Sequence, residues 1–260
     1  MVTRDTAWLP GTPCWADLSV DNVDQAVAFY GQLFGWDADI NPDPEFGGHG
    51  NFKLNGKDVA GVGPAQQPGQ PSVWTTFLAA DDLERTAAKV TEAGGTVLPP
   101  GTIAIGEFGS MIVATDPTGA VFGVWKSGTS IGAELANVPG SMTWNENLSR
   151  DWETNKKFYT EVFGYSYGDM SAEGFNYATL DLNGAPVGGI GELPPDTPGD
   201  TPPNWMNYFA VADTDATVEK IKELGGRVLN PAFDTSAGRI AIVADNQGAP
   251  FGVVSVTTSD

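Results

Sequence analysis

The chain has 260 residues, 41% of them hydrophobic and 8 of them tryptophan, a composition typical of a folded protein with a sizeable core. With 33 acidic and 13 basic residues, its formal net charge of -20 disfavours binding to nucleic acid or to an anionic membrane. No stretch approaches the roughly 20 apolar residues of a membrane span or the core of a signal peptide, which predicts a cytoplasmic protein. The single cysteine, Cys14, excludes an internal disulfide and is expected to be a small buried side chain.

The first half of the chain predicts two successive units of a strand, a helix and three strands. A strand at 13–20 precedes an amphipathic helix that begins after Asn22, a typical N-cap residue, and short alternating runs follow at 50–56 and 58–63. The order then restarts with a strand at 73–80, a helix at 82–95, and strands at 96–100, 110–116 and 120–125. Each unit therefore has the order βαβββ.

The second half of the chain repeats the first at an offset of about 130 residues. The stretch "WADLSVDNVDQAVAFYGQLFGW" at 15–36 returns as "WNENLSRDWETNKKFYTEVFGY" at 144–165, and "DPTGAVFGVW" from 116 returns as "DNQGAPFGVV" from 245. We therefore expect an α+β protein with four βαβββ units in two tandem modules, at 8–128 and 137–258.

This arrangement resembles the vicinal-oxygen-chelate superfamily, which includes glyoxalase I, bleomycin-resistance proteins and extradiol dioxygenases. The resemblance lies in the FY…FG end of the first helix, the GG end of the second and the D-P-x-G turn before the last strand. It covers nearly the whole chain and is strongest with two-module actinobacterial members, among them a mycobacterial glyoxalase-like antigen. It implies that the mixed sheet of each module curls into a cup that holds a ligand or a metal.

The resemblance also implies where metal ligands would stand. The family places a His or Gln in the first strand of a unit, seven residues before the start of the helix, and a Glu in the last strand. These positions hold Trp15, Thr75, Gly123, Trp144, Met206 and Gly252 here, none of which is a good ligand for a divalent metal. The only histidine, His49, lies in the glycine-rich "EFGGHGNF", typical of a solvated loop. We therefore expect neither a metal nor another cofactor.

Tryptophan at the ligand positions predicts an aromatic wall that suits a hydrophobic or aromatic small molecule, with room left by the glycines opposite. The expected substrate-binding residues are Trp15, Thr75, Phe77, Gly123, Trp144, Met206, Tyr208 and Gly252. The alternative is that the tryptophans fill collapsed cups as ordinary core.

Two carboxylates are candidate catalytic residues. Side chains alternate along a strand, so Asp17 shares a face with Trp15, and Glu146 shares a face with Trp144. A carboxylate beside an indole in a semi-dry cavity would have a raised pKa and could act as a general acid or base. The alternative is a structural carboxylate that faces water or a turn amide.

Three functions remain open from the sequence. The first is a metal-free enzyme of the isomerase or lyase type in secondary metabolism, with Asp17 or Glu146 carrying a proton. The second is a drug- or metabolite-sequestering protein of the bleomycin-resistance kind. The third is an interaction protein whose cups are filled. In each case we expect a monomer or a homodimer.

Overall fold

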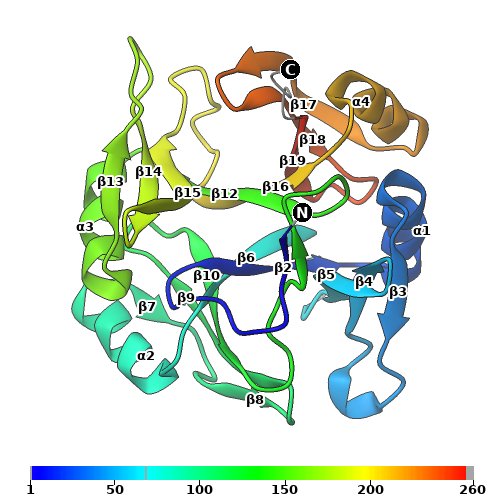
Figure 1. The fold of residues 1–260 in the computed structure, drawn as a ribbon, viewed down its shortest axis with the longest axis horizontal. Helices are drawn as coiled ribbons and strands as arrows, with labels where there is room; N and C mark the ends of the chain where they lie inside the picture. Colours follow the sequence, from blue (N-terminus) through cyan, green and yellow to red (C-terminus); the bar gives the residue numbers. More distant parts are fainter. Residues whose placement is uncertain (1, 68, 256–260) are drawn as a thin grey trace.

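The first module forms one mixed sheet, seen in the lower half of Figure 1 of this computed structural model, which describes residues 2–67 and 69–255. Its first unit contains β2 (Pro13–Val20), α1 (Val23–Phe34), β3 (Asp37–Ile40), a 3-10 turn (Pro44–Phe46), β4 (Gly50–Leu54) and β5 (Lys57–Pro64). Its second unit contains β6 (Val73–Ala79), α2 (Leu83–Glu92), β7 (Thr96–Val97), β8 (Ile103–Ile105), β9 (Gly109–Thr115) and β10 (Val121–Ser127). The strand order is β3-β4-β5-β2-β6-β10-β9-β7, with β8 paired to β9.

The second module repeats this sheet. Its first unit contains β12 (Met142–Ser149), α3 (Trp152–Phe163), β13 (Ser166–Asp169), β14 (Tyr177–Leu182) and β15 (Ala185–Glu192). Its second unit contains β16 (Asn204–Ala210), α4 (Thr214–Glu223), β17 (Arg227–Thr235), β18 (Gly238–Ala244) and β19 (Pro250–Ser255). The strand order β13-β14-β15-β12-β16-β19-β18-β17 matches that of the first sheet. A separate ribbon pairs β1 (Val2–Thr3) with β11 (Leu135–Ala136) in the linker between the modules.

The predicted α+β fold with two tandem modules is confirmed. The boundaries 8–128 and 137–258 stay a prediction, and residues 256–258 lie outside the described part of the chain. No helix in the described ranges is long and apolar enough to cross a membrane.

The four helices begin at side-chain caps, as the sequence indicates. The carboxamide oxygen of Asn22 accepts a hydrogen bond from the Gln25 amide at 3.0 Å, and Asp82, Asp151 and Asp213 cap the other helices in the same way. α1 and α3 end at Gly35 and Gly164, whose φ angles of 72° and 79° are left-handed. This conformation explains the glycine after each "FY…F" run.

The two sheets pack back to back and curl away from each other, with α2 and α3 together on one side and α1 and α4 on the other (Figure 1). The central strands β6 and β16 face each other, and Asn207 accepts hydrogen bonds from Thr76 at 3.0 Å and from Asn145 at 2.7 Å. Because the convex faces are used in this interface, the concave faces point outward on opposite sides of the molecule.

Asn145 and Asn147 replace Ala16 and Leu18 of the first module, and the structure shows why. Both asparagines are buried in the interface between the modules, where Asn147 donates to Asp116 at 3.1 Å. The first strands of both modules carry a bulge at the same place, between Pro13 and Trp15 in β2 and at the aligned residues of β12. The difference is therefore one of side-chain use and not of register.

A pair of reciprocal hydrogen-bond chains joins the modules. The Tyr30 hydroxyl of α1 donates to Asp245 in the turn before β19 at 3.0 Å and accepts from the Trp74 indole at 3.0 Å. In the opposite direction, Tyr159 of α3 donates to Asp116 at 3.0 Å and accepts from Trp205 at 2.7 Å. We call these the Tyr30 chain and the Tyr159 chain.

A second reciprocal pair involves the aromatic residue that ends each repeat signature. The Trp36 indole donates to the carbonyl of Gly140 at 2.7 Å, and the Tyr165 hydroxyl donates to the carbonyl of Gly11. In each case the donor belongs to one module and the acceptor precedes the first strand of the other. The residues that reveal the repeat in the sequence are therefore largely interface residues.

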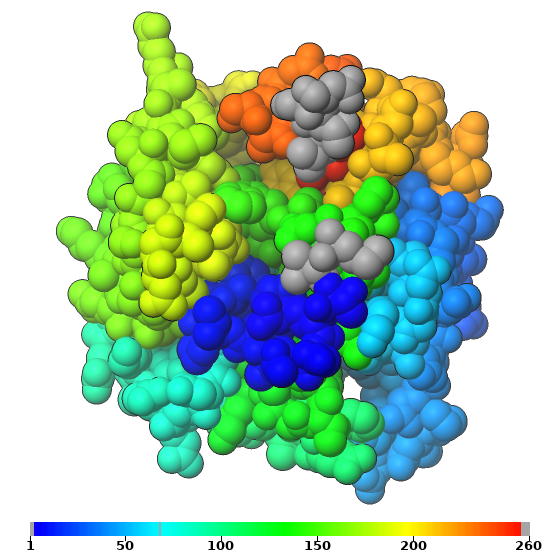
Figure 2. Space-filling model, in the orientation of Figure 1, coloured from blue at the N-terminus to red at the C-terminus, as the bar shows by residue number. Residues whose placement is uncertain are grey.

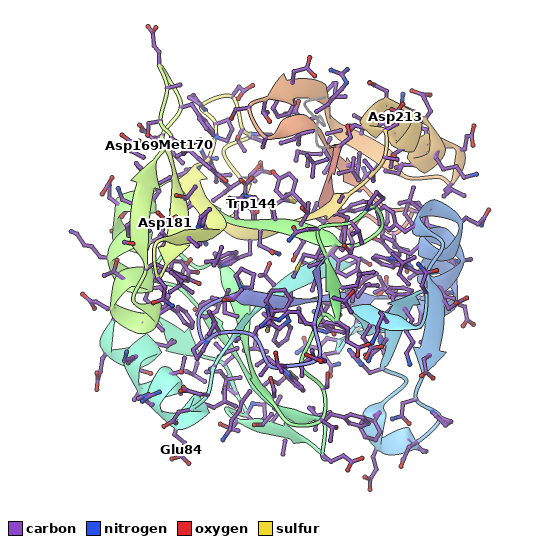
Figure 3. The ribbon with its side chains drawn as sticks, viewed as in Figure 1. Glu84, Trp144, Asp169, Met170, Asp181 and Asp213 are labelled. Carbon is purple, nitrogen blue, oxygen red and sulfur yellow. The ribbon has the colours of Figure 1, made fainter. Side chains whose placement is uncertain are left out.

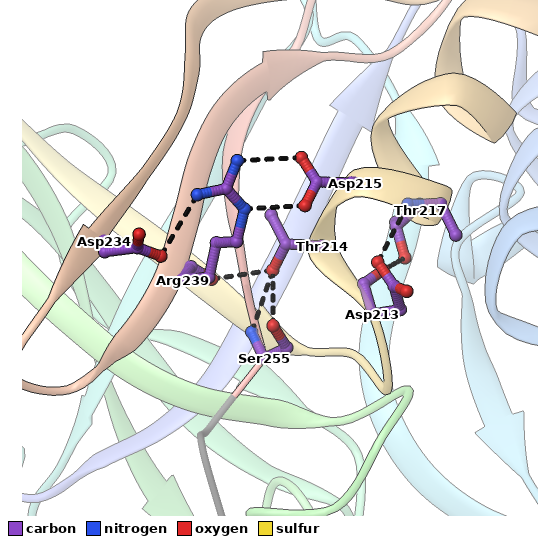
Figure 4. A network of polar contacts seen from close by, with 8 residues as sticks. Asp213, Thr214, Asp215, Thr217, Asp234, Arg239 and Ser255 are labelled. Carbon is purple, nitrogen blue, oxygen red and sulfur yellow. Dashed lines mark hydrogen bonds and ion pairs between the residues drawn. The ribbon is translucent and has the colours of Figure 1, made fainter.

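An exposed ion-pair cluster fixes the outer edge of the second sheet to α4 (Figure 4). The Arg239 guanidinium donates to Asp215 at 2.6 and 3.0 Å and to Asp234 at 3.0 Å. Since its charges satisfy one another on the surface, the cluster contributes local order and is not a candidate for catalysis.

We predict that Tyr30→Phe lowers the free energy of unfolding by about 2–4 kcal/mol, because it leaves two buried groups, of Asp245 and Trp74, without a partner. Tyr159→Phe is the matched variant and should cost less, because Asp116 keeps donors from Asn147 and Asn155. Urea unfolding followed by tryptophan fluorescence and circular dichroism should give one transition for the parent and for both variants. Two separate transitions would contradict the interdependence of the modules.

Candidate functional site

The concave face of the first sheet, here called cup 1, carries the predicted tryptophan and carboxylate side by side. Trp15 and Asp17 point to the same face of β2, and the indole lies 3.4 Å from Asp17 Oδ2. The side chain of Trp15 is nearly buried, whereas 22% of the Asp17 side chain is exposed. Thr75 on β6 is opposite Asp17 in the strand register and is half-buried.

His49 approaches Asp17 from the loop before β4. Its Nε2 lies 2.8 Å from Asp17 Oδ2, and 42% of its side chain is exposed. The expectation of a solvated loop histidine is therefore only half right. Glycines make the contact possible, since a Cβ on Gly63 would come within 2.6 Å of the His49 ring and one on Gly61 within 2.0 Å of Asp17.

The charge of Asp17 dominates the electrostatics of cup 1. It raises the pKa of His49 above its ordinary value, against the lowering effect of partial burial. A histidine with a raised pKa stabilises the fold fully below its unfolded pKa, near 6.5, and this contribution is lost as the pH rises through the folded pKa. The two side chains therefore form an ion pair wherever the pH lies below the raised pKa of His49.

The concave face of the second sheet, here called cup 2, holds its carboxylate differently. Glu146 is 9% exposed, and its two oxygens accept hydrogen bonds from Tyr208 at 2.6 Å and from Tyr177 at 2.7 Å. The Trp144 indole donates to the Tyr177 hydroxyl at 2.9 Å. Figure 3 labels Trp144 in the upper sheet, next to β15.

Burial raises the pKa of Glu146, although the two phenol donors partly oppose the shift. Burial, together with the same carboxylate, holds the pKa of Tyr177 and of Tyr208 above the ordinary value, so neither phenol ionises near neutral pH. The direction of this shift agrees with the prediction for Glu146, and its cause is burial.

The glycines at the former ligand positions do not leave open space. A Cβ on Gly123 would come within 2.2 Å of the Phe77 ring, and one on Gly252 within 2.1 Å of the Tyr208 ring. Each ring lies flat over the neighbouring strand because the glycine has no side chain. The space expected for a ligand at these two points is filled by the protein itself.

Part of cup 1 is covered by the chain ends of its own module. Trp8, Met111 and Trp125 pack on a buried cluster that contains Cys14, Trp15 and Phe77. The linker crosses at this point: Ala133 donates to Cys14 at 2.8 Å and accepts from the Trp8 indole at 3.0 Å. Figure 2 shows the N-terminal segment, in dark blue, across the middle of the molecule beside the green linker.

Two surface hollows lie outside the cups, in the grooves between the modules. One lies between α2 and α3 and is lined by Arg85, Lys89 and Phe163 among others; its counterpart lies between α1 and α4 and includes Phe34 and Lys220. Neither contains a residue of the predicted site.

Comparison with known proteins identifies the family. The model of the Glyoxalase/Bleomycin resistance protein/Dioxygenase superfamily matches residues 14–124 and 148–253. The chain belongs to this superfamily. It is 42% identical to the glyoxylase-like protein CFP32 of Mycobacterium tuberculosis, over 94% of each chain. It is also 38% identical to the anthracycline biosynthesis protein DauV of Streptomyces sp. strain C5, over 96% of this chain and 95% of that protein.

Solved structures of the superfamily share the fold. The Mn(II)-bound glyoxalase from Novosphingobium aromaticivorans aligns with a TM-score of 0.67 at 20% identity, over 95% of this chain and 83% of that one. The 2,3-dioxygenase LapB from Pseudomonas sp. KL28 aligns with a TM-score of 0.65 at 16% identity, over 95% and 93% of the two chains. At these identities the likeness concerns the fold.

The residues of this chain do not fit a metal centre of the kind found in metal-bound members of the superfamily. Asp17 and Glu146 lie on the outward faces of different sheets, so they do not share an ion, and His49 and Asp17 bind each other. Within residues 2–67 and 69–255, no group of three or more His, Cys, Asp or Glu side chains is arranged to hold a metal. Phe77 and Tyr208 occupy the places next to the former glutamate positions.

Two residues of the site differ from what the sequence predicts: His49 was expected in a solvated loop, and Tyr177 was not among the predicted site residues. They align in the repeat, because "HGNFKLNG" from 49 corresponds to "YATLDLNG" from 177. Each reaches the carboxylate of its own cup from the same position across the sheet. Aligning the two modules residue by residue places His49 and Tyr177 at equivalent positions, which is the sequence signal for their shared location.

We predict that Gly252→Ala displaces the Tyr208 ring and costs about 1–3 kcal/mol of stability, because the new methyl group overlaps the ring. The near-ultraviolet circular dichroism of the tyrosines should change with it. Gly199→Ala is the control, since no atom lies within 4 Å of a Cβ at that position. Equal stability of both variants would mean that Tyr208 does not depend on the glycine.

Proposed function

We propose that this protein is a metal-independent enzyme that transfers a proton on a hydrophobic, aromatic small molecule in secondary metabolism. The cup carboxylate, Asp17 or Glu146, is the acid/base group, and the tryptophan beside it forms the wall. The main support is that each cup has a carboxylate two residues along the strand from a tryptophan. In each cup, a side chain from another strand or loop contacts that carboxylate.

The aromatic walls and the relatives support the proposed substrate class. Aromatic side chains border the carboxylate in both cups: Trp15 and Phe77 in cup 1, Trp144 and Tyr208 in cup 2. Such walls suit flat apolar molecules. The relative DauV carries the name of anthracycline biosynthesis, which supports a polycyclic aromatic metabolite. The proposal assumes a cytoplasmic monomer or homodimer that binds neither nucleic acid nor membrane.

The proposed step is a tautomerisation. The carboxylate accepts a proton from a C–H bond next to a carbonyl group, and the electron pair of that bond forms an enolate. The carboxylic acid then returns the proton to a different atom of the substrate. No oxidant, reductant or second substrate is consumed. A raised pKa, as at Glu146, favours the carboxylic acid that exists between the two proton transfers.

Sequestration without chemistry is the second candidate. The observation that favours sequestration is that both oxygens of Glu146 already accept hydrogen bonds from two phenols. Cup 2 therefore offers mainly an aromatic surface to a ligand. Under this alternative a ligand binds to the walls and is released unchanged.

Metal independence predicts that the purified protein holds no stoichiometric transition metal, because tryptophan, threonine, methionine and glycine occupy the family's ligand positions. Elemental analysis of protein from its own host is the measurement. A tightly held zinc, iron, nickel or manganese ion at about one per chain would contradict the prediction, as would loss of activity with a chelator.

Anthrone is a suitable probe of the proposed reaction, because it is a flat aromatic ketone with acidic CH₂ protons and reacts without a partner. We predict that the protein accelerates deuterium exchange at this carbon in D₂O with air excluded, followed by NMR. If Asp17 is the base, Asp17→Asn should slow the exchange by roughly 100-fold or more, and if Glu146 is the base, Glu146→Gln should do so.

Glu84→Gln is the control for loss of one negative charge, since Glu84 is exposed on α2 and far from both cups (Figure 3). Anthrone that binds but exchanges no faster than in buffer would favour sequestration. Parent rates in both amide variants would exclude these carboxylates as the base.

A further inference from the structure

We propose that proton transfer belongs to cup 1 alone, with Asp17 as the base and His49 as the residue that positions it, while cup 2 binds ligand without chemistry. This inference rests on the proposed function and adds to it the choice of site and the role of His49. It follows from three differences between two otherwise matched cups.

The first difference is which carboxylate oxygens are free. The strand register is the same in both cups, because Asp17 is opposite Gly61 and Glu146 is opposite Gly189. Both oxygens of Glu146 accept phenol donors. In Asp17 the contacts of His49 and Trp15 both fall on Oδ2, and no donor from the described ranges contacts Oδ1. Asp17 therefore keeps one oxygen without a donor from the described residues, whereas each oxygen of Glu146 has one.

The source of this difference is a set of three substitutions. Phe77 stands where cup 2 has Tyr208, so cup 1 lacks the second phenol. His49 stands where cup 2 has Tyr177, so the remaining donor is an imidazole on one oxygen. The third change is the carboxylate itself, since Asp17 is shorter than Glu146 by one methylene group, and together the three changes leave one oxygen of Asp17 without a donor from the described residues.

The second difference is an unpaired hydroxyl in cup 1. Ser19 lies two residues after Asp17, and its Oγ is buried without a hydrogen-bond partner. The aligned residue in cup 2 is Leu148. A buried hydroxyl without a partner costs free energy, so cup 1 holds an unsatisfied polar group where cup 2 has the apolar Leu148.

The third difference is access to solvent protons. His49 is 42% exposed and contacts Asp17, so it can exchange protons with water and hold the carboxylate in place. Tyr177 has a pKa raised by burial and by Glu146, so it does not release its proton near neutral pH. Cup 1 has a path to solvent that cup 2 lacks.

The single histidine of the chain makes the first test direct, because its imidazole signals need no assignment among others. An NMR titration of the full chain should give a His49 pKa above about 6.5. Asp17→Asn should bring it down to that value or below, because Asp17 is the only charged side chain of the described residues in contact with the ring. Glu146→Gln should leave it unchanged. An unshifted pKa in the parent would overturn the pairing.

The second test uses deuterium exchange on anthrone. Asp17→Asn should slow exchange by roughly 100-fold, and His49→Gln by roughly 10-fold, with loss of the limb of the pH–rate profile that follows the NMR pKa of His49. Glu84→Gln is again the charge control. Asp17→Asn alone keeps the test valid if His49→Gln does not fold.

The results distinguish a failure of the cup 1 assignment from a failure of the proposed function. Loss of exchange in Glu146→Gln and not in Asp17→Asn would overturn the assignment to cup 1 while keeping the enzyme. A His49→Gln variant with the parent pH–rate profile would remove His49 from the mechanism. Absence of any accelerated exchange in the parent would fail the proposed function, while the titration would still report on the Asp17–His49 pair.

Discussion

The arrangement of this molecule depends on a buried aspartate that accepts a hydrogen bond from a tyrosine of the other module. Asp245 and Asp116 each sit in the turn before a final strand, and Tyr30 and Tyr159 reach them from helices of the opposite module. A buried carboxylate is costly unless donors surround it, so each module completes its partner. This requirement sets the convex faces together and leaves both cups facing outward.

The two cups show how little is needed to change the chemistry of a carboxylate on a fixed backbone. Phenol donors on both oxygens of Glu146 satisfy it in a dry setting, and burial raises its pKa. An imidazole lies 2.8 Å from one oxygen of Asp17, and both side chains remain partly exposed to water. The fold supplies the same positions in both cases, and the identity of the donor decides what the position can do.

Much of the fold is predictable from the sequence because the signals are local or repeated. The strand at 13–20, the caps at Asn22, Asp82, Asp151 and Asp213, and the shared face of Trp15 and Asp17 follow from periodicity and short-range hydrogen bonds. The contact of His49 with Asp17 spans 32 positions and needs two glycines on a third strand. The Phe77 ring over Gly123 likewise depends on strands that meet only in the folded sheet.

The linker that follows β10 joins the modules into one polypeptide while it lies against the face of cup 1. If the two modules were separate copies of one shorter chain, any substitution in one cup would also be present in the other. A fused pair has separate codons for each cup, so one site can change while the other keeps its residues. The histidine at 49 and the tyrosine at 177 illustrate that freedom, because the residue that contacts the cup carboxylate differs between the modules while the tyrosine-to-aspartate hydrogen bonds between them are the same.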